Sequence, residues 1–324
     1  MSCDAAVSYV GVDGVIATET LLKEAGFAVS QACWSRPSCF DFAARKNENL
    51  IFVKTQYDVD NLSVTDSTDL KNISSSFSAA SLLISKNTRE RPLEDDTVYS
   101  RYAVPALTLK TFENILIRRS HPLIRAGPGG YYVEIDGTAI KRKRQELGVS
   151  VGEMAKLIGV SRRTLYGYER GMAKASVSVA YKLIQALGIP VAEPMNIFRK
   201  LKAKRECPFL LTARRVLTEN KFLMRIFRKS ERCKVTTVKK APFDFVITVH
   251  EEKTKIIGGV ASNGEKDLDR RMDEILSVSN VVQARPIMIA GRERVSSKEI
   301  PCISSDELAK FRNADDLVTS VTEA

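Results

Sequence analysis

The sequence has few of the residues that build metal sites and no segment suited to crossing a membrane. It contains two histidines and six cysteines, none of them in a Cys-x-x-Cys pair, so we expect no metal site and no cofactor. No hydrophobic run approaches the roughly 18 residues that a bilayer requires. Asp4 and Asp13 stand where a secretory signal would carry basic residues. These absences predict an intracellular, cytoplasmic protein with no membrane partner.

The composition is that of a folded protein. Hydrophobic residues make up 44% and charged residues 27% of the 324-residue chain, a length that suits two or three domains. The net charge of +11 is uneven, because residues 121–200 carry 13 basic against 6 acidic residues whereas residues 1–120 carry 13 against 15. A basic middle segment is typical of a surface that binds a polyanion, although a solvated basic face would look the same.

Four helical patterns follow one another in this middle segment. Ser150, Ser161 and Ser176 each precede a pattern as an N-cap, and Glu153 completes a capping box with Ser150. A glycine follows each pattern and ends it: Gly148, Gly159, Gly171 and Gly188. We therefore predict a compact all-α unit with helices over 137–147, 150–158, 161–170 and 176–187.

The spacing inside this unit identifies its type. Ala155 is small where two helices must nearly touch, Gly159 allows a tight turn, and Leu165 faces inward. With these positions, the stretch SVGEMAKLIGVSRRTLYGYERG closely resembles the lambda-repressor and Cro family of helix-turn-helix DNA-binding domains. The resemblance extends over about fifty residues and depends on several independent positions.

The resemblance implies that the third helix lies in the major groove of double-stranded DNA. The side chains implied to read bases are Ser161, Arg162, Arg163, Thr164 and Tyr166. Two adjacent arginines would suit a half-site that contains guanine. The alternative is that both arginines touch only phosphates and set no sequence preference.

The family also implies a structural ion pair and a set of phosphate contacts. Arg144 and Glu169 occupy the positions at which family members commonly pair the first helix with the third. Many members carry a glutamine that holds a phosphate just after the cap of the second helix, whereas this chain has Val151, which puts that contact in question. The remaining candidates for phosphate contacts are Lys141, Arg142, Lys143, Lys156 and Lys174.

Short β-branched and aromatic runs flank the helical unit on both sides. The N-terminal part predicts a helix at 18–25, strands at 40–44, 50–55, 82–85 and 105–109, and a helix at 67–77. The C-terminal part predicts helices at 212–220 and 266–276, strands at 243–249, 255–260, 287–290 and 301–304, and a closing helix from Asp306. We therefore expect α/β domains over 1–120 and 200–324, a linker over 121–135 and the helix-turn-helix domain over 136–195.

The two flanks match in residues as well as in order. The run Phe40-Asp41-Phe42 matches Phe243-Asp244-Phe245, and the next hydrophobic strand follows each aspartate at a similar distance, 43 residues to Ile84 and 45 to Ile289. We interpret this as an internal duplication, although short α/β patterns can also agree by chance.

Each flank resembles the core of restriction endonucleases and Holliday-junction resolvases, in which an aspartate and a Glu-x-Lys motif hold Mg²⁺. The first copy offers Asp41 and Lys54, but Phe52 fills the acidic position. The second offers Asp244, with Ile256 and Gly258 in the other two positions. One carboxylate is a poor Mg²⁺ site, so we assign no catalytic residue and expect non-catalytic platforms for dimerisation or partner binding.

The whole arrangement resembles a family of archaeal HTH-type transcriptional regulators with a Cro-like domain between two nuclease-like domains. The resemblance includes the glycine-rich segment 127–131, a linker or hairpin turn that lacks the ending of a phosphate-binding loop. We predict a homodimeric, sequence-specific DNA-binding regulator associated with the nucleoid, and no enzyme. The alternatives are a resolvase-like enzyme targeted by the helix-turn-helix, or a protein that binds RNA or a partner in the basal transcription machinery.

Overall fold

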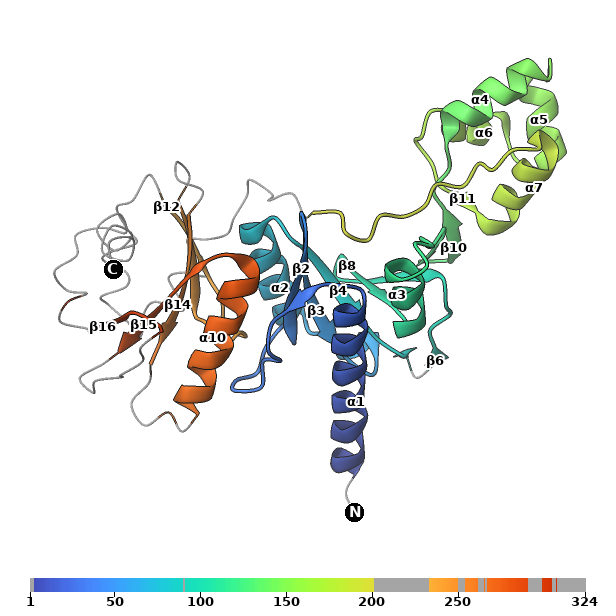
Figure 1. Ribbon diagram of the computed structural model, residues 1–324. Helices are drawn as coiled ribbons and strands as arrows, with labels where there is room; N and C mark the ends of the chain where they lie inside the picture. The colour runs from blue at the N-terminus through green and yellow to red at the C-terminus, as the bar shows by residue number, and fades with distance from the viewer. Residues whose placement is uncertain are drawn as a thin grey trace. The chain divides into compact units, whose positions relative to one another are not determined.

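The computed structural model describes residues 3–89, 91–200, 233–249, 254–261, 265, 267–290, 299–304 and 307. The chain folds into two compact units, which are best followed one at a time in Figure 1. The first unit contains Met1–Tyr57, Asn61–Leu83 and Phe198–Ala324, and the second contains Asp58–Asp60 and Ile84–Ile197. Among the described residues, no helix is both long enough and apolar enough to cross a membrane.

The first unit contains two sheets of similar construction. Its N-terminal elements are α1 (Cys3–Glu24), β1 (Ala28–Val29), β2 (Phe42–Lys46), β3 (Asn49–Thr55), α2 (Val64–Phe77) and β4 (Ala80–Ile84). Its C-terminal elements are β12 (Cys233–Thr237), β13 (Phe245–Val249), β14 (Lys255–Val260), α10 (Leu268–Val282), β15 (Arg285–Ala290) and β16 (Cys302–Ser304). The order β1-β2-β3-β4 forms the first-unit part of a nine-stranded sheet, and the order of the five-stranded C-terminal sheet is β12-β13-β14-β15-β16.

Each sheet contains an antiparallel hairpin followed by a helix. The hairpin β2–β3 places Phe42 opposite Val53, and the hairpin β13–β14 places Phe245 opposite Gly258. After α10, β15 pairs in parallel with β14, and β16 pairs in parallel with β15. This hairpin–helix–strand order agrees with the pattern that the sequence predicts for both flanks.

The two sheets pack against each other through reciprocal contacts. Helix α10 packs on β2, and α2 packs on β12 and β13. Glu274 of α10 accepts hydrogen bonds of 2.8 Å from the backbone N–H groups of Trp34 and Ser35. In the opposite direction, Asp69 of α2 accepts bonds of 3.0 and 3.1 Å from the backbone N–H groups of residues 239 and 240. A buried carboxylate on each helix therefore holds the segment that precedes the other copy's hairpin.

Within its described residues, the second unit combines short strands with five α-helices, of which the last four share one core. Its strands are β5 (Asn87–Thr88), β6 (Arg91–Pro92), β7 (Thr97–Arg101), β8 (Val104–Leu107), β9 (Ile124–Gly127), β10 (Gly130–Val133) and β11 (Ala175–Ser176). Its helices are α3 (Leu109–Leu116), α4 (Gly137–Glu146), α5 (Val151–Ile158), α6 (Arg162–Glu169) and α7 (Val177–Leu187), in addition to the 3-10 turn η1 (Val59–Asn61) at the unit border. Helices α4 to α7 enclose one core that includes Ile140, Met154, Leu165 and Leu183.

The segment 121–135, predicted as a linker, forms at residues 127–131 the hairpin turn that was one of the two predicted alternatives. This segment contains a hairpin, in which β9 and β10 pair antiparallel, and β10 also pairs with β11 just before α7. The pairs Tyr132–Ser176 and Val133–Ala175 therefore join the predicted linker to the helical domain. The sequence could not show this, because the paired residues are more than forty positions apart. The predicted helices at 212–220 and from Asp306 lie outside the described residues.

Candidate nucleic-acid interface

Local hydrogen bonds define where α5 and α6 begin and end. The Ser150 hydroxyl accepts from the Glu153 N–H at 3.2 Å, and the Glu153 carboxylate accepts from the Ser150 N–H at 2.8 Å, as a capping box requires. Gly159 ends α5 with a φ of +75°. Ser161 then caps α6 by accepting from the Thr164 N–H at 3.0 Å. Two short helices are thus separated by a three-residue turn.

The inner face of α6 is fixed by the core of the domain. Leu165 and Tyr168 of α6 and Ala155 of α5 are buried. The start of α4 lies so close to the end of α6 that a Cβ on Gly137 would lie 2.2 Å from the carbonyl oxygen of Tyr168. Only glycine fits there, so the contact determines how α4 and α6 approach.

A buried ion pair joins the same two helices. The Arg144 guanidinium donates to both carboxylate oxygens of Glu169, at 2.6 and 3.0 Å, and a third bond of 2.9 Å reaches the carbonyl oxygen of Val149. The hydrogen bonds to Glu169 raise the pKa of the Arg144 guanidinium above its ordinary value. The pair implied by the family resemblance is therefore present, and its role in this structure is to fix geometry.

The side chains implied to read bases differ in how they are held. Arg162, Arg163 and Tyr166 are exposed on α6. The hydroxyls of Ser161 and Thr164 lie 2.8 Å apart and form a hydrogen bond at the helix cap. Their positions at the start of α6 agree with the family's geometry, but their hydroxyls are already engaged within the protein.

The two adjacent arginines have different surroundings. Arg162 leans over α5, where a Cβ built on Gly152 would lie 2.9 Å from its Nε and Nη2 atoms. Arg163, the next residue, is exposed on the same helix. Because Gly152 has no side chain, the Arg162 guanidinium can lie against the start of α5.

Arg170, which directly follows α6, is an exposed candidate for DNA contact that the sequence did not single out. Its guanidinium lies 4.2 Å from the centre of the Tyr166 ring, and its Nη2 donates a 2.6 Å hydrogen bond to the Tyr166 hydroxyl. An aromatic residue and an arginine four positions apart lie on the same helix face, so this spacing was the signal available in the sequence.

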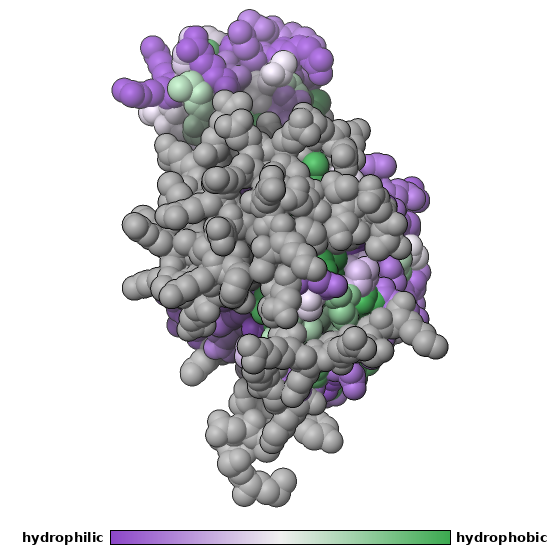
Figure 2. Space-filling view, turned by 90° about the vertical axis from the view of Figure 1, so that its left-hand side faces the viewer, coloured by the Kyte–Doolittle hydropathy of each residue, from purple (hydrophilic) through white to green (hydrophobic). Residues whose placement is uncertain are grey.

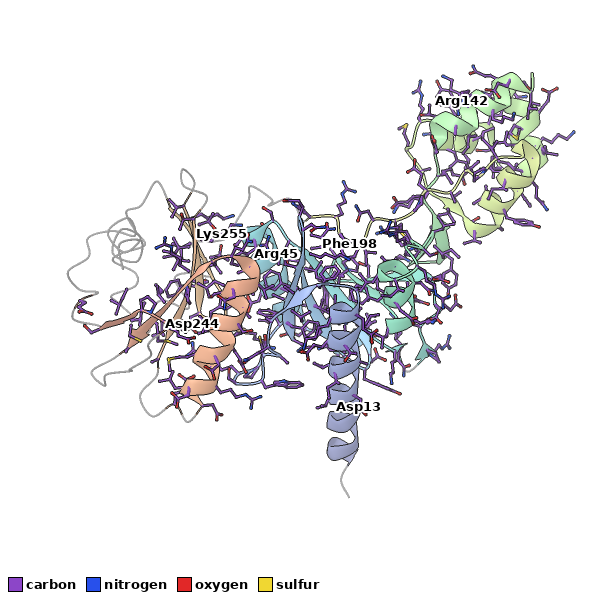
Figure 3. All side chains as sticks on the ribbon, in the orientation of Figure 1. Asp13, Arg45, Arg142, Phe198, Asp244 and Lys255 are labelled. Carbon is purple, nitrogen blue, oxygen red and sulfur yellow. The ribbon has the colours of Figure 1, made fainter. Side chains whose placement is uncertain are left out.

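Four of the five predicted phosphate contacts, Lys141, Arg142, Lys156 and Lys174, are exposed, and the labelled Arg142 lies on the outer surface of α4 in Figure 3. Three of the five form ion pairs: Arg142 and Lys143 with Glu146 at 3.9 and 3.3 Å, and Lys174 with Glu134 at 3.0 Å. In Figure 2 the helix-turn-helix end, at the top, shows a mostly hydrophilic surface.

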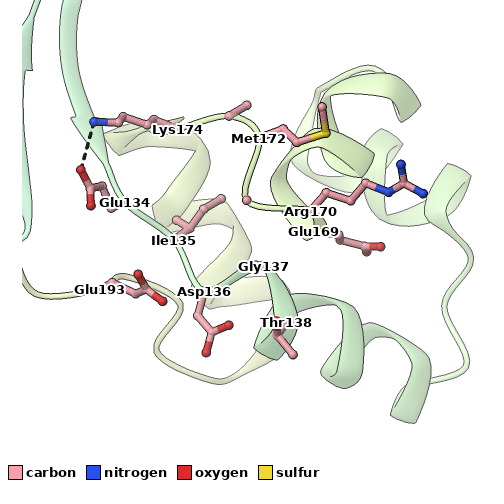
Figure 4. Close-up of a pocket in the computed structure, with 12 residues that line it drawn as sticks. Glu134, Ile135, Asp136, Gly137, Thr138, Glu169, Arg170, Met172, Lys174 and Glu193 are labelled. Carbon is pink, nitrogen blue, oxygen red and sulfur yellow. Dashed lines mark hydrogen bonds and ion pairs between the residues drawn. The ribbon is translucent and has the colours of Figure 1, made fainter. Parts of the chain in front are cut away.

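A recess of about 510 Å³ lies where α4 begins and α6 ends (Figure 4). Its wall includes the carboxylates of Glu134, Asp136 and Glu193. The Arg170 side chain extends away from these three carboxylates. The positive charge of Arg170 is therefore directed to another part of the surface.

The two aspartates of the nuclease-like sheets have matching backbone geometry. The Asp41 N–H donates to the carbonyl oxygen of Val53, and the Asp244 N–H donates to that of Gly258, both at 2.8 Å. The Asp41 carboxylate accepts from the backbone N–H of Thr55 at 2.6 Å, and the Asp244 carboxylate accepts from that of Val260 at 2.7 Å. The labelled Asp244 is seen beside α10 in Figure 3.

This register corrects one prediction. Because Val53 corresponds to Gly258, the counterparts of Phe52 and Lys54 are Ile257 and Gly259, and not Ile256 and Gly258 as the sequence analysis assigned them. The spacing in the sequence does not reveal which residues of two strands pair, so an error of one position is easily made.

The side chains around these positions do not fit Mg²⁺. Phe52 is buried between the rings of Phe40 and Phe77, at centroid distances of 5.1 and 5.9 Å. Lys54 donates to Asp41 at 2.7 Å. Among the described residues, no group of three acidic, histidine or cysteine side chains is placed to hold a metal ion.

In the C-terminal sheet, arginines surround Asp244. Arg271 is fully buried and donates to Asp244 at 2.5 Å and to Glu265 at 3.0 Å. Arg36, from the segment before β2, donates to Asp244 at 2.9 Å. The guanidinium of Arg271 therefore lies between two carboxylates, as a cation would, and a Mg²⁺ ion there would meet a fixed positive charge.

Comparison with known proteins identifies both kinds of domain. Residues 15–122 match the model of the PD-(D/E)XK superfamily domain, and residues 140–193 match the helix-turn-helix model. Among solved structures, the restriction-modification controller protein C.AhdI from Aeromonas hydrophila is 34% identical over 16% of this chain and 80% of its own, with a TM-score of 0.16.

Relatives match nearly the whole chain. A protein of Methanococcoides burtonii is 32% identical over 94% of both chains, and one of Pyrococcus furiosus is 30% identical over 94% of this chain and 95% of its own. Both bear the name "Putative HTH-type transcriptional regulatory protein". With its helix-turn-helix domain and its PD-(D/E)XK domain, the chain belongs to this family of archaeal HTH-type transcriptional regulatory proteins.

Proposed function

We propose that this protein is a transcriptional regulator that binds specific sequences of double-stranded DNA by placing α6 in the major groove. The observation that carries the proposal is the outer face of α6, which presents arginines and a tyrosine while its inner face is fixed by Leu165, Tyr168 and the Arg144–Glu169 pair. A rigid helix with exposed hydrogen-bond donors is suited to reading base edges.

The test is selection of binding sites from a random duplex library with the purified full-length protein, followed by titration of the selected and scrambled duplexes. We expect one enriched motif and an affinity ratio of roughly 10³ or more between the two duplexes. Equal affinity for both would contradict sequence-specific binding. Tighter binding to RNA, or binding only to a protein of the basal transcription machinery, would favour the alternative function.

We further propose that the protein acts as a homodimer on sites with two-fold symmetry. The chain contains one match to the helix-turn-helix model, and a helix of eight residues spans only about 12 Å, so one α6 reads a few base pairs. Two copies would read half-sites about 34 Å apart. Light scattering with and without the selected duplex measures the oligomeric state of the protein. A single monomer bound to the complete two-fold site would contradict the proposal.

The flanking sheets, in this proposal, are a duplicated and non-catalytic platform. Support comes from the shared geometry at Asp41 and Asp244, from the reciprocal carboxylate contacts, and from the basic side chains that engage both aspartates. The match to a PD-(D/E)XK model keeps a nuclease as the second candidate function. Binding to chromosomal DNA would place the protein in the cytoplasm, at the nucleoid.

A further inference from the structure

The outer face of α6 has a geometric centre that can be located from the helix itself. A helix turns about 100° per residue, so Arg163, Tyr166 and Arg170 fall within an arc of about 60°. The middle of this arc lies opposite Tyr168, which is buried in the core. The N–H of Arg170 still bonds to the carbonyl oxygen of Tyr166 at 3.2 Å, so the helical geometry extends to this residue.

Arg162 and Gly167 lie at the two edges of this face. Arg162 leans on the start of α5 at Gly152, and Gly167 has no side chain to extend from the helix. The side chains at the centre are therefore those of Arg163, Tyr166 and Arg170, of which the last has no assigned role.

Arg170 is held in place by Tyr166. The stacking distance is 4.2 Å and the Nη2 to hydroxyl distance is 2.6 Å. Within the described part of the chain Arg170 forms no ion pair, and its side chain extends away from the carboxylates of Glu134, Asp136 and Glu193 (Figure 4). One of the five guanidinium N–H groups is used by the tyrosine, which leaves four for a ligand.

From this arrangement we propose that Arg170, positioned by Tyr166, reads a base edge in the DNA site and is a specificity-determining residue of the protein. The stack reduces the conformational freedom that an arginine loses on binding, and the planar group keeps the fork that pairs with O6 and N7 of guanine. Arg163 and Arg170 are two turns apart on one face, so they contact different base pairs. The inference rests on the proposed function, because it requires a specific duplex.

The experiment compares full-length variants on the selected duplex, on the same duplex with each base pair changed in turn, and on a scrambled duplex. Arg170→Lys keeps the charge but loses the planar fork. We expect it to lower affinity for the selected duplex by roughly 5- to 150-fold and to remove the preference at one base pair. Affinity for the scrambled duplex should change by less than about twofold.

Further variants separate the reading role from a structural one. Tyr166→Phe keeps the stack and loses the hydroxyl, so we expect a smaller loss at the same base pair than with Arg170→Lys. Arg118→Lys, at an exposed arginine outside the helical domain, is the matched control and should leave both affinities unchanged. Thermal unfolding should be the same for all three variants.

The experiment distinguishes failure of the proposed function from failure of the inference about Arg170. If the wild-type protein prefers no duplex, the proposed function fails. If the wild type is specific and Arg170→Lys keeps every base preference, the inference about Arg170 is wrong. If Arg170→Lys preserves affinity on both duplexes while Arg170→Ala lowers both equally and reduces the salt dependence, then Arg170 contacts only a phosphate, which also overturns the proposal.

Discussion

At Arg144 and Glu169, a guanidinium and a carboxylate share a buried site, with side-chain exposures of 8% and 3%. Removing one partner of such a pair leaves an uncompensated charge, which costs more than the pair itself contributes. We expect Glu169→Ala to lower the free energy of unfolding of the helical domain by about 3–5 kcal/mol. Hydrogen exchange of the α4 and α6 amides in the full-length protein measures this.

The matched control for that substitution is Glu146→Ala. Glu146 pairs with Lys143 at 3.3 Å, but its side chain is 54% exposed, so its loss should change stability by less than about 1 kcal/mol. Equal exchange rates in the Glu169 and Glu146 variants would show that water screens the buried pair, and would contradict the assigned role.

Gly258 on β14 lies against the ring of Phe245 with no room for a side chain. A Cβ at this position would lie 1.9 Å from the Phe245 ring. We expect Gly258→Ala to lower the unfolding free energy of the first unit by roughly 1–3 kcal/mol, because the ring must move in a closely packed core. Urea unfolding followed by the fluorescence of Trp34, the only tryptophan, provides the measurement.

A second variant makes this result specific to the ring. Phe245→Leu shortens the side chain, so the double variant with Gly258→Ala should lose less stability than the sum of the two single variants. If the two effects simply add, the ring of Phe245 is not what restricts Gly258.

Within the helix α6, the two adjacent arginines are expected to play different roles in DNA binding. Arg162, predicted with Arg163 to read bases, lies against α5 at the edge of the outer face, so we expect it to meet phosphates, whereas Arg163 is near the centre of that face. We expect Arg162→Ala to weaken selected and scrambled duplexes equally. Arg163→Ala should cost about 1–3 kcal/mol on the selected duplex alone. Parallel titrations decide between these roles, and the same selective loss in both variants would mean that both arginines read bases.

The helices were predictable where local chemistry decides their ends. Ser150, Ser161 and Ser176 each cap a helix by side-chain hydrogen bonds, and Gly159 and Gly188 end helices in the left-handed conformation, as the sequence predicts. The turn between β9 and β10 was one of the two predicted alternatives for the glycine-rich segment, whereas the pairing of β10 with β11 was missed because the paired residues are more than forty positions apart. Arg170 was missed because its importance comes from its contact with Tyr166.

Between the sheets, the carboxylates of Glu274 and Asp69 each accept hydrogen bonds from backbone N–H groups of the opposite sheet's segment. Glu274 is buried, and each of its bonds to residues 34 and 35 involves a charged acceptor. We expect Glu274→Gln to lower the unfolding free energy of the first unit by about 1.5–3 kcal/mol and to shift the emission of Trp34. An unchanged emission spectrum would show that this contact does not order the Trp34 segment.

At the scale of the whole molecule, the N-terminal sheet and the C-terminal sheet of the first unit contact each other directly. The rings of Phe40 and Phe243 meet with centroids 6.1 Å apart. Arg36, in the segment before β2, reaches Asp244 at 2.9 Å. The Asp244 carboxylate is therefore part of the contact between the two sheets.

The consequence for chemistry is that neither sheet should cleave DNA. A hydrolytic Mg²⁺ site needs clustered carboxylates, whereas Asp41 is paired with Lys54 beside the buried Phe52, and Asp244 is paired with Arg36 and Arg271. We expect no cleavage of linear, supercoiled or four-way-junction DNA in Mg²⁺ or Mn²⁺, and no shift of the thermal unfolding midpoint when either ion is added. Cleavage that disappears in Asp41→Asn, while Asp13→Asn at an exposed aspartate of α1 retains it, would establish a nuclease instead.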